Sequence, residues 1–179
     1  KVKKGKAQDE LAILQRRKDG IGCSLAVGYD GKILEIDYDD ELQYSEFSET
    51  ISGAGCSLIP GLIDSHTHPI WAGDRVFEFD LKLRGASYLE IHNKGGGIYY
   101  TVEQTRRASE GKLFKDFLSR LKLMGECGTT TVECKTGYGL DFESEVKMLD
   151  VIKQAKSSTD IDLVTTFLGA HAKPKYLIK

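Results

Sequence analysis

Residues 61–168 alternate between two kinds of pattern, and this alternation constrains the fold more than any other feature of the sequence. Residues 113–124 and 143–156 carry apolar side chains at the spacing of amphipathic helices. Short apolar or β-branched runs that are typical of buried strands lie at 61–65, 129–134 and 161–168. Strands joined by helical crossovers of this length run parallel, with the helices packed outside them. The sequence therefore predicts an α/β fold.

Details of the helices can also be predicted. Ser87 with Glu90, and Thr101 with Gln104, have the spacing of a capping box at a helix start. The helix at 143–156 is expected to bury one apolar face, made of Val146, Leu149, Ile152 and Ala155.

The first 60 residues lack this alternation, and their pattern predicts a β-rich segment. The runs 23–29 and 32–37 flank Asp30-Gly31, a dipeptide that favours the tight turn of a hairpin. We expect a weak helix over 39–47. Residues 1–19 are expected to be frayed, or to form a short helix over Leu11, Ile13 and Leu14. Pro60-Gly61 then separates a first domain, 1–60, from a second, 61–179.

Composition excludes several classes of protein. With 25 basic and 27 acidic residues the net charge is −2, which provides no general attraction for nucleic acid or anionic membranes. No apolar run approaches the roughly 18 to 20 residues of a membrane span, and the basic start is not followed by the apolar core of a secretory signal. The four cysteines lack metal-knuckle spacing, so we expect reduced thiols in a cytoplasmic protein.

Two histidines follow the first predicted strand of the second domain. His66 and His68 are separated by one residue, so in extended chain their rings face the same side. Neutral imidazole is a good ligand for zinc or iron, and Asp64 lies at the right spacing to orient one ring. The alternative is that the pair arises by chance.

Other polar residues follow the neighbouring strands. The loop 135–139 comes after the second strand and His171 after the third. Functional sites of α/β barrels and open α/β sheets lie at the carboxyl ends of their strands. We therefore expect a site there, whereas His92 reads as a surface or packing residue.

Arg75 and several tyrosines are further candidates. A guanidinium near a metal could bind a substrate carboxylate in bidentate fashion; alternatively Arg75 forms a surface salt bridge with Asp74 or Glu78. Tyr138 lies between two glycines and is well placed to touch a small ligand. Gly95–Gly97 lacks the lysine of a phosphate-binding loop and is expected to be a mobile loop near the site.

Several motifs resemble a known family. Residues 60–68 resemble the first metal motif of the metal-dependent amidohydrolase superfamily. Within it, residues 68–75, 88–98, 132–140 and 169–171 closely resemble the imidazolonepropionases. The resemblance extends from about Cys23 to Pro174.

This resemblance implies a hydrolase of histidine degradation that opens the ring of 4-imidazolone-5-propanoate, giving N-formimino-L-glutamate, with metal-activated water. It implies His66 and His68 as ligands of one zinc or iron ion, and Arg75 as the partner of the propionate. Tyr88, Tyr138 and His171 match residues that contact the substrate, and His171 also matches a catalytic role. The full-length form is implied to be a homodimer that binds a small molecule, and neither nucleic acid nor membrane.

The implied fold is a (β/α)₈ TIM-type barrel with a small β-sandwich domain. Such a barrel needs about 250 residues, so the 179 residues would supply the first three barrel strands, preceded by part of the sandwich. On this interpretation the chain is the N-terminal part of a longer protein, without the later metal ligands and the acid/base carboxylate, and residues 175–179 do not continue the family pattern. Two alternatives remain: a sister amidohydrolase acting on another cyclic amide or an aminated base, and an inactive fragment or non-catalytic homologue.

Overall fold

The computed structural model describes residues 17–44 and 46–174. It divides into two compact units whose boundary lies between Leu58 and Ile59. The predictions for residues 1–16 and 175–179 lie outside the described residues, as does the side chain of His92.

The first unit contains the predicted hairpin. Strand β1 (Cys23–Val27) pairs antiparallel with β2 (Ile33–Tyr38), with an irregularity between Ala26 and Val27. Gly31 lies in the turn with φ +76°, a backbone conformation that favours glycine. The hairpin prediction is confirmed.

The weak helix expected over 39–47 is wrong, because the described residues there form only a turn and one bend. The acidic side chains at its start bind elsewhere: Asp39 accepts a hydrogen bond from Ser24, and Arg17 forms ion pairs with Asp40 and Glu41. The Gln43 N–H also donates to the Glu35 carboxylate at 2.9 Å, so a side chain takes the place of the carbonyl that would accept it in a helix.

The second unit contains the predicted parallel sheet. Its three strands are β3 (Leu62–Thr67), β4 (Thr129–Lys135) and β5 (Asp162–Thr166), in the spatial order β3-β4-β5. Both strand pairs are parallel, as the helical crossovers predict. Strand β3 runs two residues further than expected, so His66 lies inside the strand and His68 directly after it.

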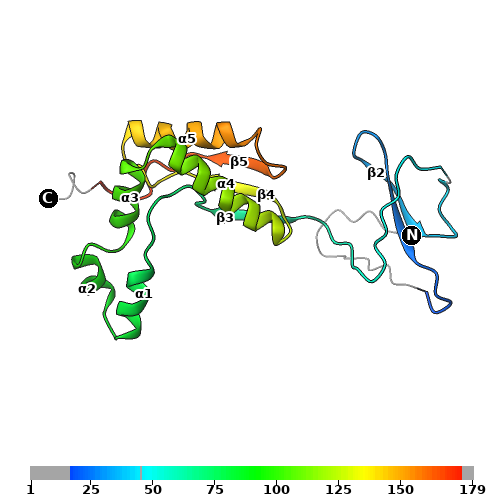
Figure 1. Ribbon diagram of the computed structural model, residues 1–179, viewed down its shortest axis with the longest axis horizontal. Coiled ribbons are helices and arrows are strands. Elements are labelled where there is room, and N and C mark those ends of the chain that lie inside the picture. Colours follow the sequence, from blue (N-terminus) through cyan, green and yellow to red (C-terminus); the bar gives the residue numbers. More distant parts are fainter. Residues whose placement is uncertain (1–16, 45, 175–179) are drawn as a thin grey trace. The chain divides into compact units, whose positions relative to one another are not determined.

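Helices α4 (Glu110–Glu126) and α5 (Phe142–Ala155) lie along one face of this sheet (Figure 1). Helix α4 buries Leu113, Phe117 and Leu121, as its periodicity predicts. The apolar face expected for α5 is rotated: the buried residues are Met148, Val151, Ile152 and Ala155, together with a glutamate, Glu145. Val146 and Leu149 are only partly buried.

Three shorter helices follow β3 and lie beyond the carboxyl ends of the strands (Figure 1): α1 (Val76–Leu83), α2 (Tyr88–Asn93) and α3 (Ile98–Arg107). The capping box at α2 is confirmed, because Ser87 Oγ accepts from the Glu90 N–H at 3.3 Å and the Glu90 carboxylate accepts from the Ser87 N–H at 2.7 Å. The second capping box is wrong. Helix α3 begins after Gly97, so Thr101 lies inside it and is buried.

The structure is thus a mixed α/β fold with one antiparallel and one parallel sheet, whereas the barrel and the sandwich remain predictions. All four cysteines are free, and only Cys134 is buried. Burial raises the pKa of its thiol to about 12. None of the helices within residues 17–44 and 46–174 combines the length and apolar composition needed to cross a bilayer.

Candidate functional site

His68 emerges from the carboxyl end of β3 and is anchored to the next strand's loop. Its Nδ1 lies 2.8 Å from the backbone oxygen of Thr136. A carbonyl oxygen can only accept, so Nδ1 carries the proton and the neutral ring presents the lone pair of Nε2. Burial and the neighbouring His171 lower the pKa of His68, which favours this neutral form.

His171, from the segment after β5, is anchored in the same way. Its Nδ1 lies 3.0 Å from the backbone oxygen of Gly137, so its Nε2 is likewise unprotonated in the neutral ring. The rings of His68 and His171 stack, with centroids 4.4 Å apart and planes 8° apart. Residues more than 100 positions apart in the sequence therefore share one location at the end of the sheet.

Tyr138 completes this group from the loop after β4. Its ring centroid lies 5.2 Å from that of His68 and 5.3 Å from that of His171. Gly137 permits this approach, because its φ is +114° and an added Cβ would lie 2.8 Å from the Cβ of His171. Burial raises the pKa of Tyr138, against an opposing effect of Arg75, so the phenol stays neutral and keeps its O–H donor.

Arg75 precedes α1 and forms a bidentate ion pair with Glu78. Its Nε and Nη2 each lie 2.7 Å from one carboxylate oxygen. The salt bridge that the sequence offered as an alternative is therefore present. The Arg75 side chain is 38% exposed, but the Glu78 side chain is 4% exposed and also accepts the N–H of Gly97 at 2.6 Å, so the pair ties Arg75 to a buried carboxylate.

A cavity of about 350 Å³ opens beside this pair. Arg75 and Tyr138 both contribute to its wall, and the other lining residues are Trp71, Gly73, Asp74, Glu78, Phe79, Lys82 and Thr101. The phenol of Tyr88 lies within electrostatic reach of Arg75, although Tyr88 is 69% exposed. The structure thus brings Arg75 together with Tyr138, whereas Tyr88 is not among the residues that line this cavity.

The residues that would hold a metal are only partly assembled. His66 is exposed and His68 is half-buried, and both lie at the carboxyl end of β3. Among the side chains that the structure describes, no group of three or more His, Cys, Asp or Glu is arranged to hold an ion. The donors present suit zinc or iron chemically, but two histidines are fewer than the three protein ligands usual for catalytic zinc. That His66 and His68 share one ion remains a prediction.

Two buried glutamates, Glu78 and Glu145, were not among the site residues expected from the sequence. Both are 3% exposed, and both accept backbone N–H groups of glycines near the site. A signal for Glu145 exists in the sequence, because it occupies the same helical stripe as Met148, Ile152 and Ala155. A charged residue on an apolar stripe is uncommon unless it has a partner.

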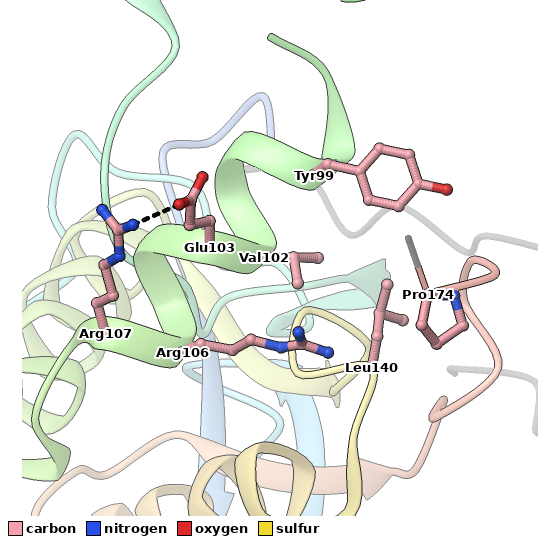
Figure 2. A pocket seen from close by; sticks show the side chains of 7 residues that line it. All are labelled: Tyr99, Val102, Glu103, Arg106, Arg107, Leu140 and Pro174. Atoms are coloured by element: carbon pink, nitrogen blue, oxygen red, sulfur yellow. Dashed lines mark hydrogen bonds and ion pairs between the residues drawn. The ribbon is translucent and has the colours of Figure 1, made fainter. Parts of the chain in front are cut away.

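A second cavity, of about 330 Å³, lies between α3 and the loop after β4 (Figure 2). Figure 2 shows the Arg106 side chain extending from α3 toward Leu140 and Pro174. Its Nε donates to the backbone oxygen of Gly139 at 2.6 Å and pairs with Asp141 at 2.8 Å. Arg106 therefore holds the same loop that carries Tyr138.

Comparison with known proteins supplies independent evidence. No family model matches the chain. Among curated proteins, it is 52% identical over 169 residues to the "Probable imidazolonepropionase" of Homo sapiens, covering 92% of this chain and 38% of the relative. A protein of the same name from Nematostella vectensis is 47% identical, and the match covers 98% of this chain and 42% of the relative. The protein of that name from Dictyostelium discoideum is 40% identical, over 96% of this chain and 40% of the relative. The chain thus spans about two fifths of the length of these relatives, and it is similar to proteins that carry the name of the family its motifs resemble.

Proposed function

We propose that this chain forms the substrate-orienting part of an imidazolonepropionase, a hydrolase that opens the ring of 4-imidazolone-5-propanoate to N-formimino-L-glutamate in histidine degradation. The observation that carries the proposal is the convergence of Arg75, Tyr138 and His171 at the carboxyl ends of the strands. Tyr138 lies between the other two, lining the cavity with Arg75 and lying 5.3 Å from His171. The names of the homologous proteins support the same reaction.

Arg75 would bind the carboxylate of the propionate. A guanidinium has five N–H groups in one plane, and the pair with Glu78 uses only Nε and one hydrogen of Nη2. The edge formed by Nη1 and Nη2 is left for a second carboxylate. Since Glu78 already balances the charge, this carboxylate would be held by directed hydrogen bonds rather than by net charge.

His171 would contact the ring. Because Nδ1 donates to Gly137, the neutral imidazole offers Nε2 as an acceptor, which suits a ring N–H of the substrate. A protonated His171 would instead donate to an oxyanion that develops on the ring carbonyl. The residue can therefore hold or move a proton at Nε2 without losing its anchor.

His66 and His68 would hold the zinc or iron ion, with further ligands from outside the described residues. When bound, such an ion polarises an amide carbonyl and lowers the pKa of a water molecule. The anchored Nδ1 of His68 keeps its other nitrogen available as a ligand.

The direct test is turnover. The protein in its full natural length, supplied with zinc or iron, is incubated with 4-imidazolone-5-propanoate, and N-formimino-L-glutamate is measured by mass spectrometry. We expect stoichiometric product and loss of activity after metal chelation. Failure to open this ring, with turnover of another cyclic amide or an aminated base, would instead identify a sister amidohydrolase.

Arg75→Lys tests the role of the guanidinium. The variant keeps the charge but loses the planar fork, so KM should rise about tenfold, equivalent to about 1.4 kcal/mol, with little change in kcat. Arg84→Lys is the matched control, because Arg84 pairs with Asp80 on the exposed side of α1. An unchanged KM in Arg75→Lys, or an equal change in the control, would refute the assignment.

A further inference from the structure

Glu145 is a buried carboxylate for which the proposed reaction has no direct use. It lies in the first turn of α5 and is 3% exposed. Both of its oxygens accept hydrogen bonds from the backbone of the loop after β4: Oε2 from Gly137 at 3.0 Å, and Oε1 from Gly139 at 2.7 Å and Leu140 at 3.0 Å. All three donors belong to the segment that surrounds Tyr138.

The loop backbone is shaped around this carboxylate. Gly137 has φ +114° and Leu140 has φ +54°, a left-handed conformation that is uncommon for leucine. A Cβ added at Gly139 would lie 2.7 Å from the backbone nitrogen of Glu145, so only glycine fits there. Successive N–H groups turned to one side form an anion-binding nest, and here the anion is supplied by the protein itself. Without it, three buried N–H groups would be left unpaired.

The same loop carries two groups of the candidate site. Tyr138 lies between the first two N–H donors, and the carbonyl of Gly137 accepts the Nδ1 proton of His171. A movement of this backbone would therefore displace the Tyr138 ring and remove the partner that sets the tautomer of His171. From the other side, Arg106 holds the carbonyl of Gly139 (Figure 2). Glu145 thus holds the loop through three backbone N–H groups, and Arg106 holds it through the carbonyl of Gly139.

We propose that Glu145 is a positioning residue for Tyr138 and His171, acting through the backbone of residues 137–140. It is not a catalytic residue, because its two oxygens are occupied by backbone donors and withdrawn from solvent. The expected effect of Glu145 on catalysis rests on the proposed function. The control of the His171 tautomer by Glu145 rests on the hydrogen-bond geometry alone.

The experiment compares Glu145→Gln with Glu143→Gln in the protein at its full natural length. Glu143 is an exposed glutamate in the same first turn of α5, so the control removes the same charge near the same helix end. Glutamine at position 145 places an NH₂ group against a backbone donor, so the loop should shift. We expect kcat to fall about 10- to 100-fold with a smaller change in KM, since a displacement of about 1 Å can cost 10²-fold in rate. The control should keep the parent values.

A second readout does not depend on turnover. With ¹⁵N-labelled histidine, NMR reports which ring nitrogen of His171 carries the proton; Glu145→Gln should reduce the Nδ1–H form, and Glu143→Gln should not. If the parent protein fails to open the imidazolone ring, the proposed function fails, while this measurement still decides the role of Glu145.

A second variant covers the case in which Glu145→Gln does not fold. Glu145→Asp keeps the charge but is too short to reach all three donors, and it is judged by the same two readouts. A folded variant with unchanged kcat and an unchanged His171 tautomer would overturn the inference.

Discussion

At the scale of single residues, Glu78 links the stability of the protein to Arg75, the arginine that we propose binds the substrate carboxylate. The hydrogen bonds from Arg75, opposed by burial, hold the pKa of Glu78 below its ordinary value of 4.5. The carboxylate therefore stabilises the fold fully above that value, and the stabilisation is lost as the pH falls through the lowered pKa. Glu78→Gln should cost about 1–3 kcal/mol at pH 7, and urea unfolding at successively lower pH should show this difference shrinking. A constant difference at every pH would contradict the assignment.

At the scale of elements, helix α4 is stabilised both by its N-cap and by its buried apolar face. Ser109 Oγ accepts the N–H of Lys112 at 3.2 Å as the N-cap, whereas Phe117 is fully buried against the sheet and α5. We expect Ser109→Ala to lower the free energy of unfolding by about 1 kcal/mol, and Phe117→Ala by about 3–5 kcal/mol. Leu123→Ala, at a 61% exposed position of the same helix, should stay within about 0.5 kcal/mol. Urea denaturation measures all three, and an equal cost for Leu123→Ala and Phe117→Ala would mean that packing on this face does not hold the helix.

At the scale of the whole molecule, the parallel sheet has one face covered by helices and one open face, on which exposed apolar side chains lie among polar ones. Val132 and Leu163 are buried under the helices, whereas Ile63 and Val164, on the opposite face, are 68% and 54% exposed. Parallel sheets are normally covered on both faces. We therefore predict that residues 1–179 expressed by themselves aggregate or bind a hydrophobic dye, and do not open the imidazolone ring. A monomer with a cooperative thermal transition, stoichiometric metal and turnover would contradict this prediction.

The sequence by itself determined the hairpin, the three parallel strands and the two long helices that connect them, in their order. Apolar periodicity, the Asp30-Gly31 turn and the pairing of Ser87 with Glu90 act over only a few residues, so each can be recognised locally. Parallel strands also place their carboxyl ends together, so His68, Tyr138 and His171 could be expected at one edge of the sheet. What local pattern could not determine was the rotation of α5 and the start of α3, because burial against distant segments outweighs the preferences of single residues.

Only the tertiary structure decided how the site residues are held. Glu78 receives the N–H of Gly97 from 19 positions away, and the Nδ1 of His68 binds a carbonyl 68 positions away. Such partners are chosen by the close approach of separate segments, and no spacing in the chain encodes them. A buried carboxylate must find donors wherever the folded backbone offers them. The charge of Glu145 on an apolar helical stripe is visible in the sequence, but only the folded loop shows that the backbone of residues 137–140 supplies its donors.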